Sequence, residues 1–258
     1  MLSITSAQLD AWIAAFIFPL TRILAVIATA PFWGSAAIPR RIRLVLGLAI
    51  AVGLAPALPP MPAVSPVSGP GVWILAQQLI IGVGMGLAMR IVYSAVDIAG
   101  ELMGLQMGLG FATFYDPTSA SQTPVVTEFM DLLALLVFLA LNGHLLYVAT
   151  LAQSFNAIPV GMSPLGSGSW LNLVELGSRM FAAGLLLALP VVVALLITNI
   201  ALAVLSRAAP QLNIMSIGFP ITLIGGFVVL AMTLNYLATP LQAIFEQGLT
   251  AMLGFATR

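Results

Sequence analysis

The acidic residues that could carry chemistry occur as two close pairs. Asp97 and Glu101 are four residues apart, and Glu128 and Asp131 are three apart. On a helix each pair would share one face. One interpretation is a proton or ion relay, which is the usual hypothesis for ionisable groups inside membrane segments. The other is structural, with charges at helix ends or ion pairs to arginines of neighbouring subunits. We favour the structural interpretation, because both pairs flank a loop.

The remaining reactive residue types are scarce. His144 is the single histidine, and the chain contains neither cysteine nor lysine. This composition argues against disulfides, thiol catalysis and histidine or cysteine metal sites. Because the chain has no lysine, it cannot form a phosphate-binding loop of the usual kind, and ATP hydrolysis is not expected. We predict no catalytic residue, metal or cofactor, and a hydrogen-bonded structural role for His144. A membrane-embedded enzyme using His144 and the acidic pairs is the weakest alternative.

The composition predicts an integral membrane protein. Only 6% of the residues are charged and 61% are hydrophobic, with a mean hydropathy of +1.13. A soluble domain has about 25% charged residues. The formal net charge is zero, so no basic surface for nucleic acid is expected. Because the N-terminus lacks the features of a cleaved signal, we expect its apolar stretch to be retained.

Apolar stretches of about 20 residues predict the membrane spans. They lie at about 11–32, 42–58, 72–96, 125–150 and 214–237, with an amphipathic tail after the last and uncharged loops at 57–71 and 158–169. The run 170–205 would extend more than about 50 Å as one helix, against a hydrocarbon core of about 30 Å. Since Pro190 lies near its middle, a kinked helix or bent hairpin is favoured over a straight rod.

The arginines predict how the chain is oriented in the membrane, and the glycines predict where its helices pack closely. By the positive-inside rule, the arginine-bearing segments face the cytoplasm and the N-terminus lies outside; these arginines are Arg40, Arg41, Arg43, Arg90 and Arg207, while Arg22 and Arg179 do not fit the pattern. Gly100, Gly104 and Gly108 form a double GxxxG motif, preceded by Gly82, Gly84 and Gly86. Small residues at this spacing predict close helix packing in lipid.

The segment 110–124, GFATFYDPTSASQTP, is the most unusual part of the chain. Proline disfavours helical geometry in the preceding residue, and the serine and threonine side chains compete for backbone hydrogen bonds. Irregular backbone at membrane depth is tolerated where it is buried in protein or lines a cavity. Two interpretations remain open, a surface turn held at the headgroups and a loop that closes a pore. The residues that would act are Gly110, Phe111, Phe114, Tyr115, Asp116 and Pro117.

Three segments resemble the FliR family of the flagellar export apparatus, whose injectisome counterparts are close relatives. They are APFWGSAAIPRRIRLVLGLAIA, GLQMGLGFATFYDPTSASQTPVVTEFMDLLALLVFLALNGH and SRAAPQLNIMSIGFPITLIGG. The resemblance extends from Leu9 to about Tyr236, and FATFYDP and APQLN…GFP are its specific parts. Many relatives carry a basic residue just after the GFP proline, where this chain has Ile221 and Thr222.

The resemblance implies a fold, partners and a site. The fold would be an all-α integral membrane protein of bent helices and helical hairpins, with a FliP-like part joined to a FliQ-like part. Residues 1–258 would form one export-gate subunit in the bacterial inner membrane, at the flagellar basal body. It would assemble with FliP, FliQ and FlhB and pass unfolded export substrates. The loop 110–124 resembles the family's plug, in which Phe111, Phe114 and Tyr115 would seal the channel and Asp116 and Pro117 would fix the turn.

Two alternatives stay open. One is the export gate of an injectisome, and the other is a secondary transporter for a small solute, which would also use broken helices. Against the transporter, the chain has no internal repeat and no matched pair of interrupted helices. A transporter should purify alone or as a homo-oligomer, whereas a gate subunit should purify with unlike partners.

Overall fold

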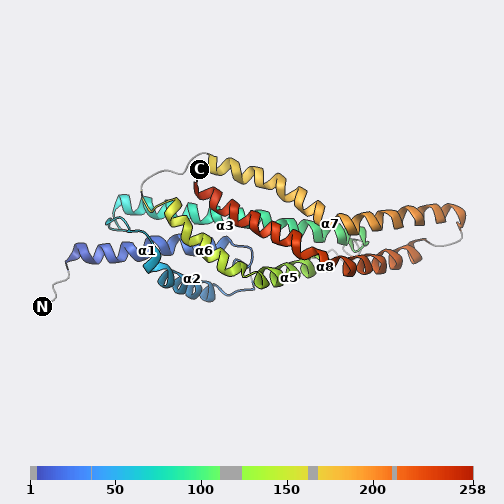
Figure 1. The fold of residues 1–258 in the computed structure, drawn as a ribbon, viewed down its shortest axis with the longest axis horizontal. Helices are drawn as coiled ribbons and strands as arrows, with labels where there is room; N and C mark the ends of the chain where they lie inside the picture. Colours follow the sequence, from blue (N-terminus) through green and yellow to red (C-terminus); the bar gives the residue numbers. More distant parts are fainter. Residues whose placement is uncertain (1–4, 36, 111–123, 162–167, 211–213, 258) are drawn as a thin grey trace. The chain divides into compact units, whose positions relative to one another are not determined.

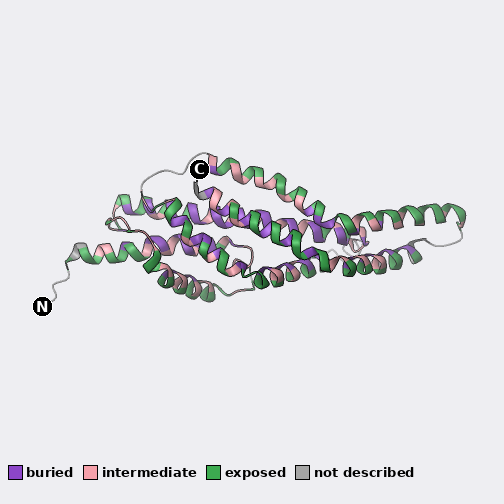
Figure 2. Ribbon diagram, viewed as in Figure 1, coloured by how far each residue is buried: buried purple, intermediate pink, exposed green. Residues whose placement is uncertain are grey.

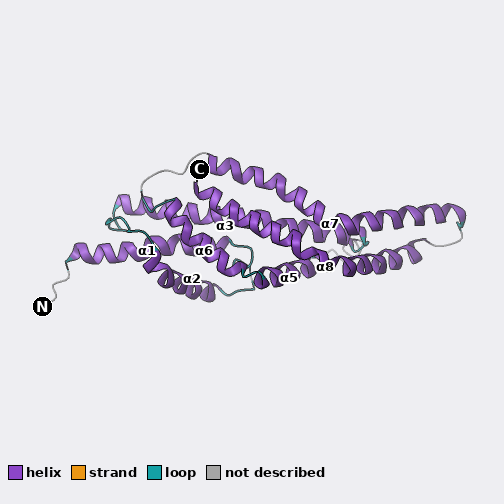
Figure 3. Ribbon diagram, viewed as in Figure 1, coloured by secondary structure: helices purple, strands orange, loops and turns teal. Residues whose placement is uncertain are grey.

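The computed structural model describes residues 5–35, 37–110, 124–161, 168–210 and 214–257, and every regular element among them is a helix (Figure 1, Figure 3). Four helices are long and apolar enough to cross a membrane: α1 (Ser6–Thr29), α3 (Gly69–Gln106), α7 (Gly168–Ala208) and α8 (Ile214–Thr257). The predicted all-α membrane fold is therefore confirmed. The predicted orientation across the membrane stays a prediction.

The second predicted span is wrong. Helix α2 (Arg40–Leu54) has 15 residues, which makes it about 22 Å long at 1.5 Å per residue. A bilayer core is about 30 Å thick, so this helix is too short to cross it. A 3-10 turn, η1 (Ala55–Ala57), follows directly and contains Pro56, whose missing N–H cannot continue the α-helical bonding. The predicted loop begins here and lasts until α3 starts at Gly69.

The fourth predicted span is also wrong as a single helix. The structure divides it into α5 (Val125–Ala140) and α6 (Gly143–Ala157), which are bent by 71°. The break falls at Asn142, which has a φ of 55° in the left-handed region. Asparagine is one of the few residues that adopt this conformation readily. The dipeptide Asn142-Gly143 therefore redirects the chain inside an apolar stretch.

The two longest helices run through their prolines. Helix α7 has 41 residues and contains Pro190, so the hairpin alternative for 170–205 is wrong. Helix α8 has 44 residues, contains Pro220 and Pro240, and includes the predicted tail. Proline in membrane helices is tolerated because neighbouring groups satisfy the freed carbonyls. Over residues 179–244, α7 and α8 lie antiparallel, and this pair is a helical hairpin (Figure 1).

The contacts divide the chain into two compact units. Unit 1 contains Met1–Tyr93, Asn142–Ser178 and Phe245–Arg258, and unit 2 contains Ser94–Leu141 and Arg179–Ile244. Unit 1 has an aromatic cluster in which the ring of Tyr93 lies 4.7 Å from that of Phe32 and 6.4 Å from that of Phe245. In unit 2, the hairpin of α7 and α8 is drawn largely as exposed and half-buried residues (Figure 2). Apolar exposure on this scale suits a membrane or another subunit.

Candidate functional site

The predicted plug loop joins α3 to α5 in unit 2. Its residues Phe111, Phe114, Tyr115, Asp116 and Pro117 lie outside the described residues, so their roles stay predictions. The first and last residues of the predicted loop, Gly110 and Pro124, are described, and the helices that they join show how its ends are held.

The first anchor is the C-terminus of α3, which ends in a Schellman motif. Gly108 has a φ of 83°, the left-handed conformation that glycine adopts without a steric penalty. The Gly108 N–H donates to the Leu105 carbonyl at 3.1 Å, and the Leu109 N–H donates to the Gly104 carbonyl at 3.0 Å. This bond pair defines the motif, and it turns the chain away from the helix axis. Gly108 thus ends α3 rather than extending its glycine face.

Helix α8 supports this anchor. The Thr222 hydroxyl is buried within hydrogen-bonding distance of three carbonyls, those of Met107 at 3.3 Å, Gly218 at 3.1 Å and Phe219 at 3.0 Å. The Met107 carbonyl lies at the end of α3, where the helix itself supplies no donor. Sequence analysis singled out the GFP segment but did not find this contact. Thr222 is the residue that ties α8 to the start of the loop.

The second anchor is the N-terminus of α5. Pro124 is its N-cap residue, and the Pro124 carbonyl accepts from the Glu128 N–H at 3.0 Å. A Cβ on Gly100 would lie 2.5 Å from the Thr127 Cα, so α3 and α5 approach backbone to backbone at this point. At Gly104 the spacing is looser, and a Cβ there would lie 3.8 Å from the Val126 Cβ. The end of α3 therefore packs against the start of α5.

The acidic pairs are distributed differently from the expectation. Asp97 and Glu101 lie inside α3, which continues to Gln106, so the helix-end explanation is wrong for this pair. Glu128 is in the first turn of α5, where a negative charge is favourable beside the helix N-terminus. Asp131 lies one turn further along α5. Neither a relay nor an intersubunit ion pair follows from these positions alone.

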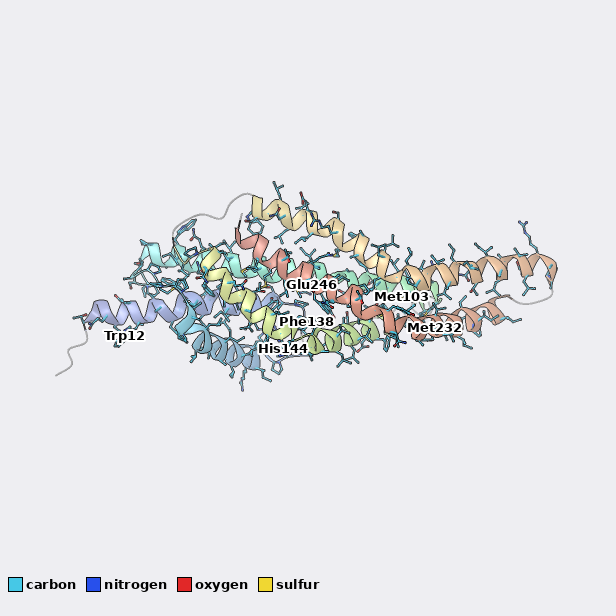
Figure 4. The ribbon with its side chains drawn as sticks, in the orientation of Figure 1. Trp12, Met103, Phe138, His144, Met232 and Glu246 are labelled. Carbon is cyan, nitrogen blue, oxygen red and sulfur yellow. The ribbon has the colours of Figure 1, made fainter. Side chains whose placement is uncertain are left out.

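His144 lies at the start of α6 (Figure 4). Its Nδ1 is buried and has no hydrogen-bond partner among the described residues. The expected hydrogen-bonded role is therefore wrong for this nitrogen within the part of the chain that the structure describes. Among those same residues, no three histidine or acidic side chains come close enough to hold a metal ion.

Arg22 forms a polar cluster in unit 1 that sequence analysis missed. Its side chain is 0% exposed and donates from Nε to Gln78 Oε1 at 2.8 Å. Nη1 donates to the carbonyl and hydroxyl oxygens of Ser154 at 3.0 and 3.2 Å, and Nη2 donates to the Ile158 carbonyl at 2.9 Å. The guanidinium carbon also lies 4.2 Å above the ring of Phe155. The only signal in the sequence was a charge in the middle of a span.

The Arg22 cluster joins three helices through neutral acceptors. Gln78 is on α3, Ser154 is on α6, and the Ile158 carbonyl ends α6. Helices α1 and α3 meet closely beside it, because a Cβ on Gly82 would lie 2.5 Å from the Arg22 carbonyl oxygen. Gly82 and Gly86 therefore allow α3 to approach α1 so that Gln78 reaches the guanidinium, whereas Gly84 faces the ring of Phe255 on α8. This cluster is a scaffold for unit 1.

Comparison with known proteins identifies related chains. A family model described as "Bacterial export proteins, family 1" matches residues 13–248. Flagellar biosynthetic protein FliR of Escherichia coli K12 is 42% identical over 247 residues, which is 96% of this chain and 94% of that protein. FliR of Pectobacterium carotovorum matches with the same identity and coverage. FliR of Bacillus subtilis is 25% identical over 92% of this chain and 93% of its own length.

Proposed function

Because this chain belongs to family 1 of the bacterial export proteins, we propose that it is a structural and gating subunit of the flagellar protein export channel. Membership of this family and the flagellar names of its relatives make it a component of a flagellar export apparatus, and its apolar helices make it a membrane protein. That this apparatus contains a channel which the chain helps to gate is what we propose in addition.

The proposed assembly is a gate made with FliP and FliQ, with FlhB bound to it, in the inner membrane at the flagellar basal body. Unfolded flagellar proteins would pass through this gate. Large apolar side chains are exposed on α7 and α8, and this exposure favours the proposal that partner subunits surround unit 2. Examples are Leu186 at 69%, Ile224 at 64% and Met232 at 70% exposure, the last on α8 in Figure 4. Lipid alone would also cover such side chains, so a test must separate the two.

The observation that carries the gating role is the anchored loop between α3 and α5. The helices at its two ends are shaped by the Schellman motif at Gly108 and by the N-cap Pro124, and the end of α3 packs against the start of α5 where Gly100 meets Thr127. A segment held in this way can carry the bulky side chains Phe111, Phe114 and Tyr115 without disturbing the helices. Hydrophobic constrictions close pores by excluding water. A gate for unfolded chains needs such a seal when it is idle.

Deletion of residues 110–114 tests this role. We expect the complex with FliP and FliQ to assemble and to make the membrane leak small ions, because the seal has lost two aromatic side chains. A triple variant Phe111→Ser, Phe114→Ser and Tyr115→Ser should leak as well, with the loop length kept. Ion flux from vesicles containing the complex is the measurement. The control is Val67→Ser, a 90% exposed residue in the loop before α3.

Unchanged ion permeability in an assembled deletion variant would sink the plug assignment. A pull-down in mild detergent separates the broader alternatives. Recovery of FliP and FliQ supports the gate, whereas a stable homo-oligomer that moves a small solute would support the transporter. Recovery of injectisome subunits instead would move the same gating role to that system, although the relatives above are named as flagellar.

A further inference from the structure

Helix α2 presents an apolar stripe that none of the described residues of unit 1 covers. Ile42, Val45, Ala49 and Val52 are all exposed, with fractions of 57%, 63% and 63% for the isoleucine and the two valines. Their spacing of three, four and three residues places them along one side of the helix. The opposite side contains the buried Gly47, where a Cβ would collide with the side chain of Leu24 on α1. One face of α2 is therefore occupied by protein and the other is free.

The N-terminal end of this helix carries positive charge without compensation. Arg40 and Arg41 are exposed, and neither forms a hydrogen bond or ion pair with any residue that the structure describes. Arg43 differs, because it donates to the carbonyls of Ser35 at 2.6 Å and Ile38 at 3.1 Å. The first turn has no acidic residue, and the N-cap Pro39 makes no side-chain bond. Cations at a helix N-terminus are unfavourable beside the dipole, and among the described residues Arg40 and Arg41 have no anionic partner that would offset this cost.

The position of α2 beside α1 indicates the depth of Arg40 and Arg41 in the membrane. Helix α1 is a candidate span that ends at Thr29, and α2 packs back along it, with Gly47 beside Leu24. The arginines thus lie near the end of the span, which is where lipid headgroups lie. From Ile42 to Val52 the stripe extends about 15 Å at 1.5 Å per residue. This length is half of a hydrocarbon core of about 30 Å, and so matches one leaflet.

We propose that α2 binds an anionic phospholipid, with the phosphate at Arg40 and Arg41 and an acyl chain along Ile42, Val45, Ala49 and Val52. Adjacent basic and apolar surface on one helix is typical of lipid-binding helices. The stripe contains no polar side chain that would specify a protein partner, and its charges are confined to the headgroup end. This site is independent of the proposed gating role, since the loop 110–124 belongs to unit 2.

Lipid counting by native mass spectrometry tests the headgroup contact. The purified full-length chain, with its partner subunits if they copurify, is titrated with phosphatidylglycerol and with phosphatidylcholine. We expect a preference for phosphatidylglycerol that falls about 25-fold in Arg40→Gln/Arg41→Gln, because each arginine at an anionic surface contributes about fivefold. Arg40→Lys/Arg41→Lys should keep most of the preference. Arg207→Gln, which removes an exposed arginine at the end of α7, is the matched control and should change it little.

A spin label tests the stripe. The chain has no cysteine, so Ala49→Cys provides a single labelling site. In nanodiscs we expect high collision with oxygen and low collision with a water-soluble nickel chelate, as for a lipid-facing position. A label accessible to neither reagent would mean that a protein subunit covers the stripe, and one accessible to nickel would mean water. Either result would overturn the proposal, as would equal retention of both lipids by the wild-type chain.

Discussion

Unit 1 and unit 2 have the same membrane-type composition but hold their helices together differently. In unit 1 the buried polar residues among those described are Arg22, Gln77, Gln78, Thr150, Ser154 and Ser169, whereas in unit 2 they are Thr127 and Thr222. Unit 1 therefore adds a buried charge with directional hydrogen bonds to its glycine contact at Gly82. Unit 2 relies on backbone approach at Gly100 and on a helix terminus shaped by Gly108.

The difference shows two solutions to one physical problem. Between helices in lipid there is little hydrophobic driving force, so association needs close packing or polar contacts. A buried arginine supplies several donors at once, but it is costly if its acceptors are missing. Glycine contacts are weaker and depend on shape. Unit 1 should therefore be sensitive to the loss of one polar group, and unit 2 to the addition of one methyl group.

The largest effect is expected from Arg22→Met, which breaks the polar cluster of unit 1. It leaves the acceptors of Gln78, Ser154 and Ile158 without their donor, and each unsatisfied buried group costs about 1–3 kcal/mol, so the loss should reach about 3 kcal/mol. All four tryptophans (Trp12, Trp33, Trp73 and Trp170) belong to unit 1, so tryptophan fluorescence during denaturation follows this unit.

Arg41→Met is the matched control within unit 1, and its exposed position predicts a change within about 0.5 kcal/mol. A neutral or stabilising Arg22→Met would mean that burying the charge costs more than its hydrogen bonds return. In that case the comparison between the two units would fail.

An intermediate effect is expected from a pair of substitutions within one motif of unit 2. Gly100→Ala places a methyl group 2.5 Å from the Thr127 Cα and should destabilise by about 1–3 kcal/mol through overpacking. Gly104→Ala meets nothing closer than 3.8 Å and should be neutral or stabilising by up to about 1 kcal/mol, because alanine favours the helix. Thermal unfolding followed by circular dichroism measures both. Effects of the same sign would show that shape does not govern this interface.

The smallest effect is expected from Gly108→Ala at the end of α3. Its φ of 83° costs an L-residue about 1–2 kcal/mol, and the new methyl group would lie 3.1 Å from Phe219. The control is Gly177→Ala in α7, where open space surrounds the added methyl group and no loss is expected. Chemical denaturation of both variants is the measurement. Equal stability of the two would show that the Schellman motif does not hold the start of the loop.

Local features of the sequence were sufficient to predict the class of protein and most of its helices. The shortage of charge required a membrane fold, and the clusters of proline and glycine marked the loops before α3 and after α6. The prediction of the span 125–150 failed because a local helix-breaking signal was overlooked. The span 125–150 looked continuous because hydropathy averages over a break, yet Asn142 and Gly143 end one helix and begin another.

Partner identity depended on the tertiary structure. The acceptors of Arg22 lie 56 to 136 residues away along the chain, and no local pattern relates such distant positions. Likewise, Gly100, Gly104 and Gly108 look equivalent in the sequence, but the first meets a backbone, the second has space and the third ends a helix. Hydropathy and turn propensity are properties of neighbouring residues, so the sequence alone determined a helical membrane protein and predicted a loop at 110–124. Which donor meets which acceptor, and which glycine is indispensable, depends on distances that arise only when the helices pack.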